Sequence, residues 1–376
     1  MSLWLMALIV FWLAFAIYDL IAVVRLAELP TTQPDGQPPD VTIVMAVRDD
    51  EAHVEASVQR LLAQRHVRAR LAIVDDRSND GTTAILARLA ATDPRLAVRR
   101  VDTLPQGWLG KTHALQVATT DVSTRWILFT DGDAQLGSDT LARAIAFAER
   151  NDAHHVSLLP THRGTTFLGR TCLLAFQLSV QHRVLAVNAK QQRGFVGTGA
   201  FNLVRTDAYR AIGGHEPLRL EVVDDVWLGC LLFRAGFRSR VLLAARDFAI
   251  DWGATPRALL RVVEKNMFAV LRYRAWLAGS LGLLAIGVIV ATFALPWWLG
   301  PIGWVAVGAC LATGLAGAVL ARRMQWEVAA GLLVPLARVL LPIALLRSTF
   351  VTLRQGGVRW RGTFYPLAEL RRGQVP

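Results

Sequence analysis

Charged residues are scarce in this 376-residue chain: 19% of the residues are charged, 53% are hydrophobic, and the mean hydropathy is +0.36. This balance is too apolar for a wholly soluble chain, and it excludes disordered, collagen-like and coiled-coil proteins. We therefore expect part of the chain to lie in lipid. The 29 acidic and 41 basic residues require a second, water-facing folded part, because charges are costly to bury.

Several patterns that carry chemistry are also missing. The three cysteines, Cys172, Cys230 and Cys310, are far apart and form no CxxC pair, which argues against a disulfide framework or a zinc knuckle. The sequence has no HExxH, no GxSxG and no GxxxxGK[ST], so zinc hydrolases, serine hydrolases and P-loop enzymes are disfavoured. The net charge of +12 is compatible with nucleic acid, an anionic membrane leaflet or a phosphorylated ligand, and the apolar segments favour the membrane.

Long apolar runs lie near both ends of the chain. Leu3–Val24 carries one charge, and as a helix it would be about 33 Å long, so residues 1–25 are expected to form a transmembrane anchor. A proline-rich linker, 26–40, follows. Residues 275–321 contain two uncharged runs separated by PWWLGP, a pattern that predicts a transmembrane hairpin with an aromatic turn. Arginines flank this hairpin on both sides, which predicts a multi-pass protein of the cytoplasmic membrane with its catalytic domain on the cytoplasmic side.

The last apolar stretch is interrupted. Residues 328–353 contain two arginines and two prolines, so we expect 322–353 to form a broken, re-entrant or interfacial segment, with a full span as the alternative. The basic tail, 354–376, would then be cytoplasmic. Residues 252–274 are expected to be an interfacial segment.

The region 41–251 alternates between strand and helix patterns. This alternation predicts an α/β domain with a mainly parallel, Rossmann-like sheet and with ligand loops at the carboxyl ends of its strands. Phe167–Val187 has two interpretations, an interfacial helix that guides lipid or a buried core helix. The expected strands are Val41–Val47, Leu71–Val74, Trp126–Thr130 and Val156–Leu159, and the expected helices are Glu51–Ala63, Thr82–Ala91, Ser138–Arg150 and Val226–Ala235.

Acidic residues follow two of these strands. Asp75 and Asp76 come after the second strand, where a carboxylate can accept hydrogen bonds from a base or ribose, whereas Asp80 is better explained as a helix cap. Asp131 and Asp133 follow the third strand, where alternate residues point the same way. Two such carboxylates repel each other unless a cation lies between them, so the pair predicts Mg²⁺ or Mn²⁺ with a diphosphate.

Two further positions are chemical candidates. Lys111 lies at the start of a helical stretch, beside backbone amides that can meet phosphate. Asp224 and Asp225 precede another helix, so they are either residues favoured by the helix dipole or an orienting residue and a general base.

Taken together, these motifs resemble family 2 glycosyltransferases of GT-A fold, specifically the membrane-anchored branch similar to hopanoid-associated and ceramide-type glucosyltransferases. The motifs are VTIVMAVRDDEAHV, VDDRSNDGT, GKTHAL, TDGD and VVDDVWLG. The resemblance implies donor binding by Arg48, Asp50, Asp75, Asp76 and Lys111, with Asp76 at uracil. It further implies metal ligation by Asp133, Asp131 toward the ribose, and Asp225 as the base beside Asp224.

The family's Q/RxxRW acceptor motif is absent, because Glu264-Lys265 stand where Arg-Trp is usual. This absence disfavours processive polysaccharide synthesis. Arg359, Trp360 and Arg361 in the tail form a candidate substitute: in an extended stretch both guanidiniums would face one way and clamp a diphosphate or the acceptor. The alternative is a juxtamembrane basic patch that is attracted to anionic headgroups.

The sequence therefore predicts an inverting, metal-dependent glycosyltransferase that moves a sugar from a nucleotide diphosphate donor, expected to be UDP-linked, to a membrane lipid hydroxyl. The alternatives are a polyisoprenyl-phosphate sugar transferase, whose phosphate acceptor needs no strong base, and a catalytically silent nucleotide-binding scaffold.

Overall fold

The computed structural model describes residues 3–32 and 36–375, and they fall into two compact units. Parts of the expected anchor (1–2), linker (33–35) and tail (376) lie outside the described residues. The unit that contains the long apolar helices comprises 3–26, 162–185 and 252–358; the unit that contains the main sheet comprises 27–32, 36–161, 186–251 and 359–375. The expected continuous domain 41–251 is thus interrupted at 162–185, and most of the tail belongs to the sheet unit.

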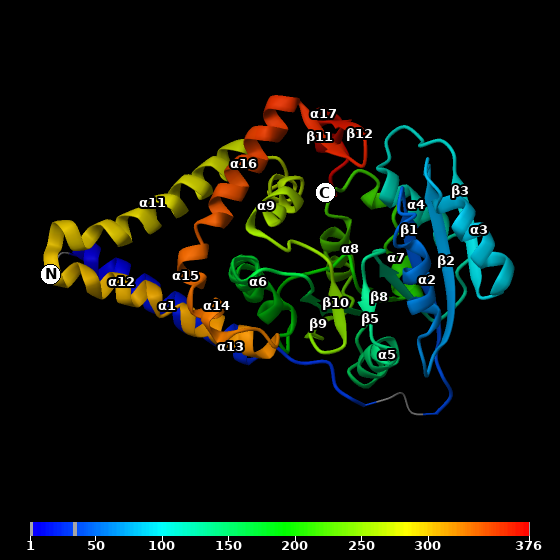
Figure 1. Cartoon of the computed structure of the whole chain (residues 1–376), viewed down its shortest axis with the longest axis horizontal. Helices are drawn as coiled ribbons and strands as arrows, with labels where there is room; N and C mark the ends of the chain where they lie inside the picture. The colour runs from blue at the N-terminus through cyan, green and yellow to red at the C-terminus, as the bar shows by residue number, and fades with distance from the viewer. Residues whose placement is uncertain (1–2, 33–35, 376) are drawn as a thin grey trace. The chain divides into compact units, whose positions relative to one another are not determined.

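The sheet unit is built on seven strands in the order β3-β2-β1-β4-β8-β6-β9 (Figure 1). All neighbouring pairs are parallel except those of β8, which runs antiparallel to β4 and β6. This arrangement confirms the expected α/β class with a mainly parallel sheet. The strands are β1 Asp40–Val47, β2 Arg68–Asp76, β3 Leu96–Val101, β4 Trp126–Thr130, β6 His155–Leu159, β8 Asn202–Arg205 and β9 Ser239–Leu243.

The central strands form because their sequences are continuous apolar runs. Ile43, Val44 and Met45 in β1 are fully buried, as expected for a strand covered on both faces. Sequence periodicity identified β1, β2, β4 and β6, but it missed β3, β8 and β9. β3 is an edge strand that contains exposed arginine, and β8 is only four residues long, so neither carries a strong apolar signal.

The remaining elements of this unit are short. The helices are α2 Val54–Leu62, α3 Thr82–Thr92, α4 Gly110–Ala118, α5 Thr140–Arg150, α7 Thr206–Ala211, η1 Glu216–Leu218, α8 Asp224–Arg234 and α17 Leu367–Arg372. The small strands are β5 Gln135–Leu136, β7 Thr161–His162 and β10 Phe248–Ile250. A hairpin is formed by β11 Gly357–Trp360 and β12 Thr363–Pro366; its first two residues are assigned to the helical unit and the rest to the sheet unit.

The strand order reverses between β1 and β4, since β2 and β3 continue on one side of β1 and β8, β6 and β9 on the other side of β4. In open α/β sheets, ligands bind outside the carboxyl ends of the strands at such a switch point. A ligand site is therefore expected at the loops after β1, β2 and β4.

The other unit is helical. Three of its segments, Leu3–Val24, Ala275–Arg323 and Val334–Gln355, are long and apolar enough to cross a membrane. Its helices are α1 Leu3–Val24, α6 Phe167–Val187, α9 Pro256–Glu264, α10 Met267–Val270, α11 Ala275–Leu299, η2 Gly300–Ile302, α12 Gly303–Leu311, α13 Gly314–Arg323, α14 Val328–Leu332, α15 Val334–Ala337 and α16 Leu340–Gln355.

Two details of this unit differ from the sequence expectations. The expected turn PWWLGP is partly helical, because α11 continues through Pro296 to Leu299 and the chain reverses only at η2. Most of α6 is buried, although Phe167 and Leu168 at its start are exposed. This burial favours the core-helix interpretation of α6.

The segment α14–α16 is broken, and it links the open ends of the hairpin formed by α11 and α12–α13 (Figure 1). Its first part packs on α13, where Gly317 and Gly331 let the two backbones approach closely. Its last part packs on the first third of α11, where Leu346 covers Gly282, and on α10, where the Ser348 hydroxyl accepts from the Phe268 N–H at 3.0 Å.

A buried ionic cluster connects three parts of this unit. Asp19 in α1 is fully buried, and its carboxylate accepts from Arg338, between α15 and α16, and contacts His182 Nε2 of α6 at 2.7 Å. The Arg338 guanidinium also lies 4.7 Å from the Phe15 ring centroid. Because an unpaired buried charge is strongly destabilising, this cluster fixes how α1, α6 and α16 pack together.

Candidate active site

Asp131 and Asp133 lie at the carboxyl end of β4, on a turn closed by a 3.2 Å hydrogen bond from Ala134 N to Asp131 O. The strand ends at Thr130, so the expectation that these acids alternate along a strand is corrected to a turn. Desolvation, and after it the negative charge of Asp131, raise the pKa of Asp133 to about 6. Asp50 from the loop after β1 is nearby, because a Cβ at Gly132 would lie 3.0 Å from its Oδ2.

Lys111, in the first turn of α4, connects two acidic motifs. Its Nζ lies 3.0 Å from Asp131 Oδ1 and 3.5 Å from Asp224 Oδ1. Burial lowers the pKa of Lys111, but the carboxylates of Asp131, Asp224 and Asp225 more than offset this and hold it above its usual value. Lys111 is therefore a fixed positive charge at the switch point.

Asp224 and Asp225 form the first turn of α8, where the helix dipole favours negative charge. The Asp225 carboxylate accepts from Val226 N at 2.9 Å through Oδ1. Burial, then the neighbouring Asp224, raise the pKa of Asp225 to about 6, while Lys111 acts in the opposite direction. Asp225 is thus a carboxylate whose pKa lies close to neutral pH.

Gly199 is the point on which these charged groups converge. A Cβ built there would lie 2.9 Å from Asp131 Oδ2, 3.4 Å from Lys111 Nζ and 3.5 Å from Asp225 Oδ2. Nearby, a side chain at Gly197 would collide with the Asp225 carbonyl. The loop 197–199 can pass over this cluster only because it has no side chains at those two positions.

Behind this cluster lies a cavity of about 10 Å³, enough for about one water-sized group. It is lined by Lys111, Leu115, Phe129, Thr130, Gly199, Asn202, His215, Asp224, Asp225 and Leu228.

Asp76, the expected nucleobase ligand, forms a two-point ion pair with Arg77 (2.7 and 3.0 Å) and is 5% exposed. A Cβ at Gly110 would overlap both side chains, so α4 begins directly against this pair. The Tyr365 hydroxyl of the tail accepts from Gly110 N at 3.1 Å. Asp76 and Arg77 therefore form one ion pair against the start of α4.

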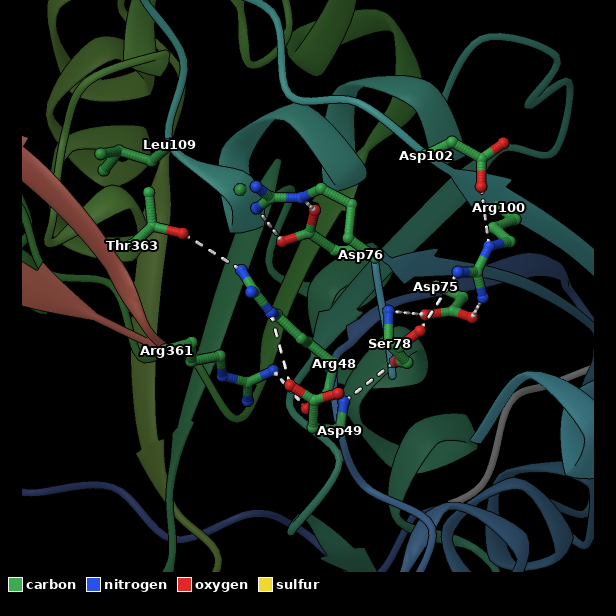
Figure 2. Close-up of polar contacts among 12 residues, drawn as sticks. Arg48, Asp49, Asp75, Asp76, Ser78, Arg100, Asp102, Leu109, Arg361 and Thr363 are labelled. Atoms are coloured by element: carbon green, nitrogen blue, oxygen red, sulfur yellow. Dashed lines mark hydrogen bonds and ion pairs between the residues drawn. The ribbon is translucent and has the colours of Figure 1, made fainter. Parts of the chain in front are cut away.

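Arg48, after β1, lies beside the tail hairpin (Figure 2). Its Nη1 donates to Thr363 Oγ1 at 3.2 Å, its Nε lies 3.5 Å from Asp49 Oδ2, and its carbonyl accepts from Arg361 Nη1 at 3.5 Å. Hydrogen bonds therefore join the tail to the loop after β1.

The geometry of the tail departs from the sequence expectation. β11 ends at Trp360, and Arg361 has φ 45°, so the three residues do not form one extended stretch. The Arg359 guanidinium lies 5.6 Å from the Phe364 ring centroid, whereas Arg361 reaches Arg48. The expectation that both guanidiniums face the same way is therefore corrected, and Arg361 is the one that contacts the loop after β1.

Asp75 requires another correction, because it is fully buried and its oxygens serve the loop itself. Ser78 N and Arg100 Nη1 each donate to it at 3.0 Å (Figure 2). Thr83 Oγ1 also donates to it, at 2.5 Å. A direct contact with donor is not available to it, so Asp75 shapes the loop that carries Asp76. Asp80 accepts from Thr82 N at 3.0 Å and lies one residue before Gly81, the N-cap residue of α3.

Sequence reasoning missed Gly199, His215 and Tyr365. The Gly-Thr-Gly at 197–199 and the Gly-Gly that precedes His215 are local signals of a close backbone approach. Nothing local marks Tyr365, because its partner Gly110 is 255 positions away.

Known proteins resemble this chain in both sequence and fold. Residues 42–213 match the model of the family described as Glycosyl transferase family 2. A putative glycosyltransferase, EpsE of Bacillus subtilis, is 25% identical over 207 residues, which are 53% of this chain and 69% of that protein. The 4,4'-diaponeurosporenoate glycosyltransferase of Staphylococcus aureus is 24% identical over 192 residues, and the match spans half of each chain.

Among solved structures, the mannosyltransferase PcManGT from Pyrobaculum calidifontis, in complex with GDP-Man and Mn²⁺, aligns with a TM-score of 0.57. The alignment covers 93% of this chain and 98% of that one at 17% identity, a level that supports a common fold. The mainly parallel sheet, the acids at the strand ends and the relatives together support a family 2 glycosyltransferase of GT-A fold.

Proposed function

We propose that this protein is an inverting glycosyltransferase that moves a sugar from a nucleotide diphosphate donor to the hydroxyl of a membrane lipid at the cytoplasmic face. One observation carries the proposal: Lys111, Asp131 and Asp225 converge around Gly199 at the strand-order switch. A positive charge for the leaving diphosphate then lies beside a carboxylate suited to accept a proton.

The proposed chemistry is a single displacement. Asp225 accepts the proton of the lipid hydroxyl, whose oxygen bonds to the anomeric carbon while the bond from that carbon to the diphosphate oxygen breaks. Lys111 stabilises the charge that develops on the diphosphate. Asp224 holds Lys111 in place through their 3.5 Å ion pair.

The acids at the turn after β4 suit a divalent cation. Asp133 and Asp131 carry carboxylate oxygens, the ligand type that Mg²⁺ or Mn²⁺ prefers. A bound cation would reduce the repulsion between the two carboxylates. The described residues contain no cluster of three or more metal-ligating side chains, so the remaining ligands would be donor phosphates and water. Such an ion supplies charge neutralisation for the departing diphosphate. That PcManGT was solved with Mn²⁺ supports this assignment.

The base and phosphates of the donor are assigned to the edge formed by Arg48, Asp76 and Arg77. UDP follows from the resemblance of the Asp76 loop, whereas the GDP-Man in PcManGT makes a guanosine donor the competing choice. The apolar helices and the Staphylococcus aureus relative, a 4,4'-diaponeurosporenoate glycosyltransferase, support a lipid acceptor.

The test uses membranes that contain the protein, a panel of labelled UDP- and GDP-sugars, and identification of the labelled lipid. Asp225→Asn is expected to lower turnover by about 10²-fold or more with little change in donor affinity, because only proton transfer is lost. Retained activity in this variant would favour a phosphate acceptor, as in polyisoprenyl-phosphate sugar transferases. If wild-type protein transferred no sugar and hydrolysed no donor, the scaffold alternative would stand.

A further inference from the structure

His215 lies directly before η1 and is fully buried. Its Nδ1 is 2.7 Å from the Tyr209 hydroxyl, and its backbone N–H donates to Gln116 Oε1 at 2.9 Å. Its ring meets Phe129 of β4 edge to face at 4.9 Å between centroids. Three separate contacts thus fix the position and rotation of this imidazole.

The other ring nitrogen, Nε2, is buried and has no hydrogen-bond partner among the described residues. His215 lines the water-sized cavity together with Lys111, Asp224 and Asp225. Buried polar atoms without a partner are rare and costly, so an oriented ring nitrogen beside a polar cavity indicates that something binds there.

The ring is neutral at any working pH, because burial, and after it the positive charge of Lys111, lower the pKa of His215 to about 3. A neutral imidazole carries one N–H. If the Tyr209 hydroxyl donates to Nδ1, the proton resides on Nε2 and points into the cavity. An oxygen there can accept from Nε2 and donate to a carboxylate.

We propose that His215 is a positioning residue for the proposed base Asp225, acting through one hydroxyl-type oxygen held in the cavity between Nε2, Lys111 and Asp225. The inference rests on the proposed function and deepens it. The oxygen belongs either to a water molecule or to a hydroxyl of the bound sugar, since the cavity admits only one such group. In both cases it donates to Asp225 and orients that carboxylate.

The test compares His215→Phe, which keeps a flat ring on Phe129 but removes both nitrogens, with His215→Gln, whose amide N–H can replace the donor. His162→Phe is the matched control: His162 is another buried, neutral histidine, with a pKa lowered to about 4 by burial, and it does not line the cavity. Melting temperature, kcat, KM and the affinities for nucleotide-sugar and nucleoside diphosphate are measured for each variant.

We expect His215→Phe to lower kcat/KM by about 10- to 100-fold, the range expected from a misplaced catalytic group, and His215→Gln to recover part of this loss. If the oxygen is water, kcat falls and both affinities stay unchanged. If it is a sugar hydroxyl, the affinity for the nucleotide-sugar falls and that for the nucleoside diphosphate does not. Wild-type kinetics in His215→Phe would overturn the proposal, as would equal losses in both variants that follow their melting temperatures.

Failure of the proposed function is detected separately. If the wild type transfers no sugar from any donor, nitrogen NMR of His215 decides the inference. The inference is supported if His215 is the Nε2–H tautomer and its resonance shifts in Asp225→Asn. It is refuted if the resonance is the same in Asp225→Asn as in the wild type.

Discussion

At the scale of single residues, identical side chains in this chain have different roles because their surroundings differ. Asp75 and Asp76 are adjacent, yet Asp75 is held by the loop and Asp76 by Arg77. Asp131 pairs with Lys111, and the negative charge of Asp131 helps to raise the pKa of Asp133. The availability of lone pairs, rather than the residue type, separates a residue that shapes a loop from one that can bind a ligand.

Asp133→Asn is expected to abolish metal-dependent donor binding, because a neutral amide is a weak ligand for a hard cation and balances none of its charge. Calorimetric titration of the nucleotide-sugar with and without Mn²⁺ measures this. Asp121→Asn is the control, since Asp121 is 72% exposed and pairs with Arg99. Unchanged metal dependence in Asp133→Asn would remove Asp133 from the metal site.

The raised pKa of Asp225 predicts a pH dependence. A base must be deprotonated, so kcat/KM should fall as the pH drops through about 6. Asp224→Asn removes a negative charge that raises this pKa, so the acid limb should move to lower pH, while Asp224→Glu should leave it in place. Profiles between about pH 4.5 and 8 test this. A limb that stayed fixed, or moved upward, in Asp224→Asn would contradict the assignment.

At the scale of elements, the site depends on loops that approach each other where strands end. Acids follow β1, β2 and β4 directly in the chain, but the loop 197–199, which precedes β8, brings Gly199 against Asp131 and Asp225. The tail adds a further edge through β12 and Tyr365.

Gly199→Ala should reduce turnover strongly without unfolding the protein, because its Cβ would lie 2.9 Å from Asp131 Oδ2 and would displace the charged groups. Kinetics and thermal melting are compared with those of Gly279→Ala, where an added Cβ meets nothing within 4 Å. Equal activity in the two variants would show that the convergence on Gly199 is unimportant.

Tyr365→Phe is expected to weaken donor binding about fivefold, the equivalent of about 1 kcal/mol for one hydrogen bond, because the start of α4 loses the acceptor of Gly110 N. Nucleotide affinity is the measurement. Tyr18→Phe, in α1 of the helical unit, controls for a general effect of losing a tyrosine hydroxyl. A larger effect on kcat than on affinity would instead assign the tail to the chemical step.

At the scale of the whole molecule, the contacts of α14–α16 bear on topology. Arg338 pairs with Asp19 near the end of α1, and Leu346 packs near the start of α11. If α1 and the hairpin cross the membrane, Arg338 and Leu346 lie at a similar depth, toward the side on which α1 ends and α11 begins. We therefore expect α14–α16 to lie along the cytoplasmic interface rather than to cross the bilayer.

Cysteine labelling tests this topology. The native Cys172, Cys230 and Cys310 are buried, so Gly357→Cys introduces an accessible thiol at the start of the tail. A membrane-impermeant reagent should label it only from the cytoplasmic side. Labelling from outside would make Val334–Gln355 a full span and would separate the tail from a cytoplasmic active site.

The sequence by itself determined the α/β class, the central strands and the acids that follow them. These features are local: a buried parallel strand needs a continuous apolar run, and a carboxylate at its end is adjacent in the chain. The long apolar helices were visible for the same reason, because length and hydropathy are sufficient to identify them.

Only the tertiary structure decided that Gly199, His215 and Tyr365 lie at the candidate site, that Asp75 is turned inward, and that Arg361 but not Arg359 reaches the loop after β1. These outcomes depend on side chains from distant segments competing for the same few hydrogen-bond partners and the same space. Hydrophobic periodicity records which face of an element is buried, but it contains no information on which distant residue is packed against that face.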